Sequence, residues 1–221
     1  MSNEKIYILT QSHSGAFVVC DWGGISLAAD TYVTNTVNGT TYTFTVTSTN
    51  TKDKTANVSL SKIGGKDLAS YTGTDLNLKA TYSDGTYTSG DTTYTITSME
   101  AMRGNKTIKT VEMPSTVTSL PASCFSGCTA LTTVSFPGIT TLPNNCFDGC
   151  TALTSFSFTG IKTIGSFAFY NCSKLTDITI PSGATVGQRA FQNCTGLTKL
   201  TIPEGATVGE RAFQFCTGLT G

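Results

Sequence analysis

The chain has 221 residues, enough for one large domain or two small ones, and 38% of them are hydrophobic, which is enough to build a core. It carries 14 basic and 14 acidic residues, and only 13% of its residues are charged, about half of the usual share of ~25%. A neutral chain offers no electrostatic attraction to phosphate backbones or anionic lipids, so we expect no nucleic-acid partner. No apolar run approaches the roughly 18 residues of a membrane helix, so we expect no membrane insertion either.

The N-terminal segment shows neither a signal peptide nor a strong catalytic motif. In the first 15 residues the apolar run, Ile6 to Leu9, is shorter than the ~7 to 15 residues of a signal-peptide core. The only histidine, His13, precedes Cys20, and such a pair could in principle supply a base and a nucleophile. The alternation from Gly15 to Cys20 is more typical of a strand that places Cys20 by packing. We therefore predict no catalytic residues and no cofactor.

Residues 1–96 are rich in Thr, Ser and Gly and predict an all-β module that also covers the exposed edge of the repeats that follow. Turn signals at Asn38-Gly39 and Asp84-Gly85 indicate hairpins. We expect the aromatic residues of this module to be core, with glycan stacking on Trp22 as the alternative. The predicted strands are Thr41 to Thr47, Ala56 to Leu60, Leu76 to Tyr82 and Thr93 to Thr97.

From about Thr97 onward the sequence repeats every 22 residues, and self-similarity of this kind is the signature of a solenoid. Three of its columns are Phe125, Phe147, Phe169, Phe191 and Phe213; Cys128, Cys150, Cys172, Cys194 and Cys216; and Leu131, Leu153, Leu175, Leu197 and Leu219. An atypical first copy through Met102 and Asn105 aligns with a 23-residue step. We therefore predict about six coils of 22–23 residues over residues 97–221.

Within a coil, Leu131, Val134 and Phe136 follow an apolar-x-x-apolar-x-apolar pattern whose last positions alternate as in a strand buried on one face. Pro137 follows directly and ends the strand, because proline cannot donate to a ladder. The segment from Gly165 to Cys172 predicts one helical or 3₁₀ turn on the opposite side. A single coil would leave two broad apolar faces in water, so the coils must stack.

The cysteine column favours a ladder of buried, reduced thiols. Stacked coils place equivalent Cα atoms about 4.8 Å apart, within the range of a disulfide, but the side chains of one column point the same way. One bridge, between Cys124 and Cys146, is the alternative. Asn105 occupies the cysteine position of the first copy, which indicates hydrogen bonding to the backbone at a turn. A zinc site needs four converging ligands, so we predict no metal.

Two columns of outward residues line one face of the predicted parallel sheet. Threonine suits the solvent side of a strand, so the plain interpretation is a soluble surface. The functional interpretation is a neutral, hydroxyl-rich platform for a protein or glycan, although it lacks the Trp, Tyr and Arg anchors of most hot spots. The predicted binding residues are Thr133, Ser155, Asp177 and Lys199 in one column and Ser135, Ser157, Thr179 and Thr201 in the other.

The string AFQNCTGLTKLTIPEGATVGERAFQFC, which begins at Ala190, resembles the BspA-type leucine-rich repeat, also called the Treponema pallidum type. The segments Asn38 to Thr43, Tyr71 to Gly73 and Gly90 to Met99 resemble what precedes such repeats in this family. The resemblance implies an α/β solenoid, that is, a right-handed leucine-rich-repeat superhelix with a parallel β-sheet and short helical turns, preceded by the all-β N-terminal module. It also implies a bacterial surface or secreted protein that binds host proteins or other cells.

We therefore expect a non-enzymatic binding or adhesion protein that recognises a host or neighbouring-cell protein or glycan through the sheet face. The alternative is a structural spacer or multimerising repeat whose N-terminal module or partner chain does the recognition. The pattern stops at Thr220-Gly221, where another strand should begin. An open last coil favours truncation or self-association.

Overall fold

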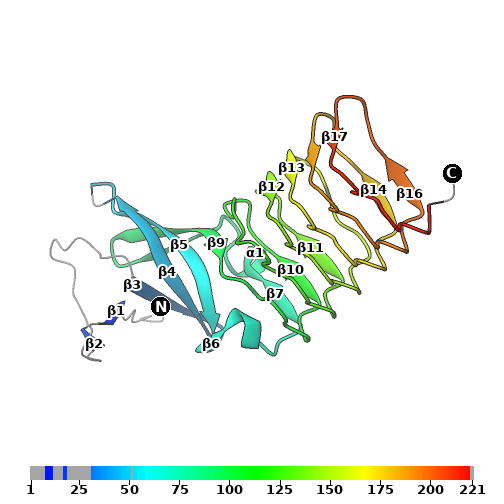
Figure 1. Cartoon of the computed structure of the whole chain (residues 1–221). Coiled ribbons are helices and arrows are strands. Elements are labelled where there is room, and N and C mark those ends of the chain that lie inside the picture. Colours follow the sequence, from blue (N-terminus) through cyan, green and yellow to red (C-terminus); the bar gives the residue numbers. More distant parts are fainter. Residues whose placement is uncertain (1–7, 12–16, 19–30, 51, 220–221) are drawn as a thin grey trace.

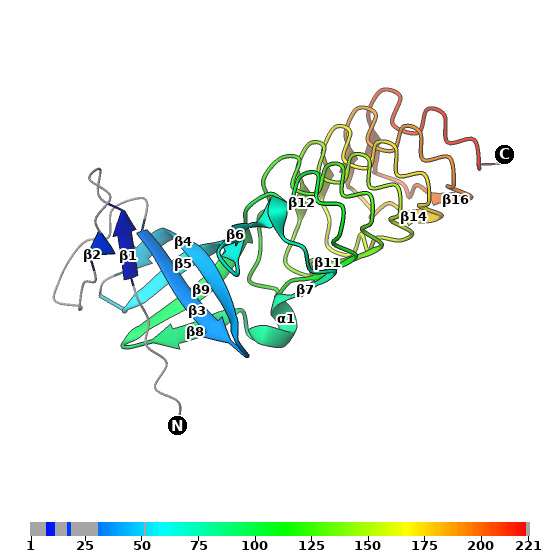
Figure 2. The ribbon, with the colours of Figure 1, turned by 90° about the horizontal axis from the view of Figure 1, so that it is seen from below.

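The computed structural model describes residues 8–11, 17–18, 31–50 and 52–219. An antiparallel β-sheet unit comes first in the chain, and a solenoid of stacked coils extends from it to the C-terminus (Figure 1 and Figure 2). His13, Cys20 and Trp22 lie outside the described residues. The hypotheses of a Cys-His pair and of glycan stacking on Trp22 therefore stay untested.

The first unit is a sheet of eight strands in the order β2-β1-β3-β4-β5-β9-β8, with β6 pairing β5 off this path. Only the β5–β9 pair is parallel. Its apolar face includes Phe44, Tyr87 and Tyr94, all buried, and the rings of Tyr87 and Tyr94 stack at 4.9 Å. The strands are β1 (Ile8–Gln11), β2 (Phe17–Val18), β3 (Thr31–Val37), β4 (Thr40–Asn50), β5 (Thr55–Ile63), β6 (Lys66–Asp67), β8 (Thr86–Ser89) and β9 (Thr92–Met99).

One of the two predicted hairpin turns is confirmed and the other is wrong. Asn38 and Gly39 take positive φ values of 49° and 77° and join β3 to β4. Asp84-Gly85 instead follows the helix α1 (Leu78–Thr81), and the hairpin of this region turns at Gly90, between β8 and β9. The predicted strand from Leu76 to Tyr82 is likewise cut short, because the side chain of Asn77 caps α1 by accepting the N–H of Ala80 at 2.8 Å.

The solenoid has two rows of parallel strands. One row contains β7, β10 and β11 and, further along, β14 and β16; the other contains β12, β13, β15 and β17. The second row, which the sequence did not predict, carries the buried column of Leu142, Ile164 and Val186. The strands are β7 (Asp75–Asn77), β10 (Thr110–Glu112), β11 (Thr133–Ser135), β12 (Thr141–Leu142), β13 (Thr163–Ile164), β14 (Asp177–Thr179), β15 (Thr185–Val186), β16 (Lys199–Thr201) and β17 (Thr207–Val208).

Where one helical or 3₁₀ turn was predicted, the described coils form no helix but single turns closed by 3₁₀-type bonds, such as the one from the N–H of Cys172 to the carbonyl of Phe169 at 3.2 Å. Phe167 and Asn171 take left-handed φ values of 58° and 60°, which a right-handed helix cannot accommodate. Between them Phe169 donates its N–H at 2.7 Å to the carbonyl of Ala190 in the next coil, rather than to its own turn. These turns therefore add a third line of backbone hydrogen bonds between coils.

The N-terminal unit covers the first coil by imitating one. β7 pairs in parallel with β10, as we expected of a module that covers the exposed edge. A 3₁₀ turn, η1 (Leu68–Ser70), precedes β7, and Asn105 donates its amide to the carbonyls of Leu68 at 3.2 Å and Tyr71 at 2.7 Å. The oxygen of the same amide accepts the N–H of Ile108 at 2.9 Å. The role predicted for Asn105 is thus confirmed, whereas the boundary at residue 96 stays a prediction.

The solenoid core is a continuous stack of rings. Phe125, Phe147, Phe169 and Phe191 are fully buried, and the rings of successive coils lie parallel or nearly so, at centroid distances of 5.1 to 5.4 Å. Such offset stacks add to the free energy gained by burying each ring.

The cysteines form the reduced ladder that the sequence favoured. The seven described cysteines are free and buried. In each coil the thiol donates to the carbonyl of the core residue one coil earlier, as Cys172 does to Phe147 at 3.2 Å. Burial raises the pKa of Cys128 to about 11 and that of Cys150 further still. The thiols of this column thus donate hydrogen bonds to backbone carbonyl groups of the turns.

Native cysteines should consequently resist thiol reagents. A thiol reacts as its thiolate, and burial raises the pKa of five described cysteines of the earlier coils, which keeps that form scarce at pH 8, whereas the pKa of Cys216 in the last coil is lowered by its hydrogen bond with Cys194. We expect at least 7 of the 8 cysteines to react in denaturant, and far more slowly in the native protein, in a timed titration. Fewer than seven reactive groups in denaturant would contradict the reduced ladder.

Candidate functional site

Seven of the eight predicted residues of the sheet face are exposed, and Ser135 is half-buried. Asp177 and Thr179 on β14 lie in register with Lys199 and Thr201 on β16. The structure thus brings these four together, while Thr133 and Ser135 lie on β11. Ser155 and Ser157 stand between the two groups in a segment that forms no strand. The exposure of the seven is as expected, and the binding role of all eight stays a prediction.

The face continues toward the N-terminal unit through residues that the sequence analysis did not include. Thr110 and Asp75 extend the first column, and Glu112 and Asn77 the second. Hydrogen bonds from the hydroxyls of Thr110 and Thr74 lower the pKa of Asp75. The 23-residue step could have revealed Thr110 and Glu112, whereas Asp75 and Asn77 carry no repeat signal. This end of the face is acidic.

The sheet is interrupted at the coil of Ser155 and Ser157. In neighbouring coils Met113 donates its N–H to Ser135 at 3.0 Å and Ile180 donates to Thr201 at 2.9 Å. The equivalent bonds from Phe136 and Phe158 are missing in the described chain, and the bond from Thr154 to Thr132 is stretched to 3.5 Å. Both inward positions of this coil, 156 and 158, hold phenylalanines whose centroids lie 4.8 Å apart. Their bulk holds the segment out of the ladder.

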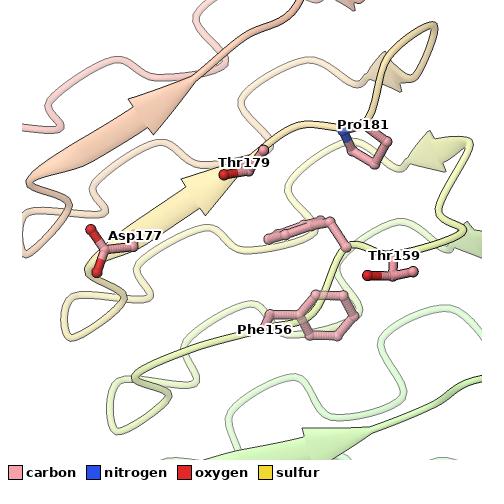
Figure 3. Close-up of a pocket in the computed structure, with 6 residues that line it drawn as sticks. Phe156, Thr159, Asp177, Thr179 and Pro181 are labelled. Atoms are coloured by element: carbon pink, nitrogen blue, oxygen red, sulfur yellow. The ribbon is translucent and has the colours of Figure 1, made fainter.

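A cavity of about 340 Å³ opens at this interruption. Figure 3 shows Asp177 and Thr179 on β14, and Phe156 and Thr159 on the coil before it. Asp177 lies at one end and Pro181 beyond the other. Phe156 is partly exposed and forms the apolar wall, together with the nearly buried Phe158. The predicted set contained Asp177 and Thr179 but missed the phenylalanines, which the period had assigned to the core.

A second hollow, of about 580 Å³, lies in the N-terminal unit between the β3–β4 turn, the β5–β6 turn and Tyr71. It brings together the Asn38-Gly39 turn region and the Tyr71-Thr72 segment singled out in the sequence. Its walls are largely glycine and threonine, and its one charged lining residue is Lys66. It has as many non-glycine lining residues as the cavity on the sheet face, six in each, but none of them is a carboxylate.

The tyrosine and arginine anchors that the predicted sheet-face residues lack are found on the turn side of the solenoid, the surface formed by the turns around Phe167 and Arg189. Phe167 and Tyr170 meet edge to face at 5.6 Å, and the guanidinium of Arg189 lies 5.6 Å from the Phe167 ring. Tyr and Arg are enriched at binding hot spots. The turn side is therefore the alternative candidate for the binding surface.

The last described coil exposes Ile202 and Val208, whose equivalents are buried one coil earlier, and also Phe215, which stands where earlier coils have Asn171 and Asn193. Ile202, Val208 and Phe215 are 44%, 40% and 58% exposed, whereas Ile180 and Val186 are buried. Self-association through this coil stays a prediction, and these three side chains are the ones that would meet.

No cluster of three or more His, Cys, Asp or Glu among the described residues could hold a metal ion. Within the same residues, no helix has the length and apolarity to cross a membrane.

Stacked coils with parallel strands on one face and a Phe-Cys-Leu core define a leucine-rich-repeat solenoid. The chain belongs to the family of the BspA type leucine rich repeat region, which matches residues 95–220 in 6 copies. Repeats of this family are generally non-enzymatic. No curated protein matches the sequence.

Solved structures show the same fold. A leucine-rich repeat protein from Bacteroides ovatus is 27% identical with a TM-score of 0.63, over 80% of this chain and 44% of that one. A leucine rich cell surface protein from Faecalibacterium prausnitzii is 21% identical with a TM-score of 0.62, over 85% and 53%. The T. pallidum leucine rich repeat protein is 20% identical with a TM-score of 0.54, over 80% and 88%. The chain thus spans about half the length of the first two.

Proposed function

We propose that this chain is a non-enzymatic recognition protein that binds a host or neighbouring-cell protein or glycan through the solenoid sheet face. The observation that carries the proposal is the open hollow beside Asp177 and Thr179, because apolar and polar side chains of neighbouring coils converge there on the sheet face. Solenoids use extended faces of this kind for recognition.

A surface or extracellular location and a role in adhesion are part of the proposal. They are supported by the family and by the resemblance to a protein described as a cell surface protein. On β14 and β16 the face carries one charge of each sign, with Lys199 beside Asp177, and its other end carries Asp75 and Glu112, so it suits a ligand of mixed chemistry rather than a polyanion.

The competing function is a spacer whose N-terminal unit or partner chain does the recognition. Binding isotherms of the labelled protein on immobilised host extracellular material separate the two. Replacing Asp177 and Lys199 together by alanine should weaken binding at least about fivefold, the cost of losing contacts that matter at an interface.

The matched control is Arg189→Ala on the turn side, which should leave the isotherm unchanged. If the sheet-face variant binds as the wild type does, the sheet face is a spacer. Loss of binding in the Arg189 variant alone would move recognition to the turn side. Both variants must keep the wild-type circular dichroism spectrum.

A further inference from the structure

The residues that line the cavity on the sheet face carry one negative charge and no positive charge. Its lining comprises Phe156, Phe158, Thr159, Asp177, Thr179 and Pro181. These residues supply one carboxylate, two aromatic rings and two hydroxyls, but no cation. A group that is apolar along its length and positively charged at its tip would complement all of them.

Asp177 is available to such a group. It is exposed, and its only side-chain hydrogen bond in the described chain is a long one, 3.3 Å, from the neighbouring Thr176. Lys199 is its register partner on β16, yet the two make no ion pair among the described residues. The carboxylate therefore lacks a partner of opposite charge.

The shape of the cavity suits a long side chain better than a β-strand. The coil of Phe156 and Phe158 remains between β11 and β14, so an added strand has no vacant place in the sheet. Figure 3 shows Asp177 to one side of Phe156, and Phe158 also lines the hollow. An arginine stem could run along Phe156, with its planar guanidinium reaching the carboxylate.

We propose that this cavity receives an arginine side chain of a partner protein, an inference that rests on the proposed function of the sheet face. Arginine fits better than lysine because its guanidinium both stacks on an aromatic ring and bonds a carboxylate with two parallel N–H groups. Lys199 stands close enough in the register to compete for Asp177.

The test uses N-acetyl-arginine amide as the probe and N-acetyl-citrulline amide, its neutral isostere, as the matched control. Amide resonances of the labelled protein are followed by nuclear magnetic resonance during each titration. We expect arginine, but not citrulline, to shift the signals of Thr159, Asp177 and Thr179 in a saturable way. The shifts should weaken as salt is added.

Variants then assign the effect to the pocket. Asp177→Asn should weaken the arginine probe about threefold to fivefold, the range expected for an exposed ion pair. Lys199→Gln should strengthen it, because a competing cation is removed. Glu204→Gln removes a carboxylate outside the cavity and should leave the titration unchanged.

Equal shifts with citrulline, no saturable shift with arginine, or an unchanged Asp177→Asn titration would each overturn the arginine site. Saturable shifts with glucose or galactose in place of arginine would assign the cavity to a glycan instead. If the arginine titration gives one of these results but the Asp177 and Lys199 double variant still binds host material more weakly than the wild type, the proposed function of the sheet face stands without the arginine site. If the double variant binds host material as the wild type does, the proposed function itself is wrong.

Discussion

Replacing Phe169 by alanine is expected to lower the free energy of unfolding by about 3 to 5 kcal/mol, among the largest costs of a single core substitution. The ring is fully buried, and it stacks on Phe147 at 5.2 Å and on Phe191 at 5.1 Å. Phe156 also meets it edge-on at 5.2 Å. Alanine would leave a cavity between three coils that the rigid stack cannot close.

Urea denaturation followed by circular dichroism measures this cost, and amide exchange shows where the stack opens. We expect the protection of the coils on either side of Phe169 to fall first. Phe215→Ala is the matched control, because this side chain is 58% exposed and its removal should change stability by at most about 0.5 kcal/mol. Equal unfolding midpoints for the Phe169 variant and the wild type would show that the ring stack does not hold the coils together.

Much of the solenoid could be predicted because residues of the same chemical type recur at the 22-residue period. A residue such as Phe169 or Cys172 recurs every 22 positions, and only stacking can bury such a column. The left-handed turns were missed because Phe167 and Arg189 share a conformation, with φ values of 58° and 55°, but no residue type. The backbone ladder around them imposes this geometry on whatever side chain is present.

The site was less predictable than the fold because it arises where the repeat fails. Outward residues such as Asp177 and Thr179 follow directly from the alternation of a strand. The cavity beside them depends instead on two rings, Phe156 and Phe158, competing for the width of one coil. A pattern of apolar positions assigns both rings to the core and contains no information about their combined volume.

The junction between the two parts of the chain was the hardest to predict, because its contacts join distant residues without periodicity. β7 and η1 imitate a coil, but their sequence shares no column with the repeats. Asn105 was the one signal, since an amide stands where later coils have cysteine. Its two donors reach the carbonyls of Leu68 and Tyr71, whereas a thiol could bond only one of them.

Replacing Asn105 by leucine should therefore cost about 2 to 5 kcal/mol, because several buried backbone groups lose their partner at once. The residue is 2% exposed, and its oxygen accepts the N–H groups of Thr107 and Ile108, each at 2.9 Å. Leucine has a similar volume but neither donors nor acceptors, so the loss is of hydrogen bonds rather than of packing. We expect a lower urea midpoint and faster amide exchange at η1 and β7.

Two further variants separate hydrogen bonding at this junction from a general effect of losing an asparagine. Asn105→Cys restores the residue of the later coils and, with a single weak donor, should recover only part of the stability. Asn57→Ala removes one exposed hydrogen bond, to Ser48 at 3.0 Å, and should stay within about 0.5 kcal/mol of the wild type. If Asn105→Leu unfolds like Asn57→Ala, the N-terminal unit is held to the first coil by the β7–β10 ladder and apolar packing alone. A large loss confined to the Asn105 variants would instead place the strongest polar contact of the junction at this amide.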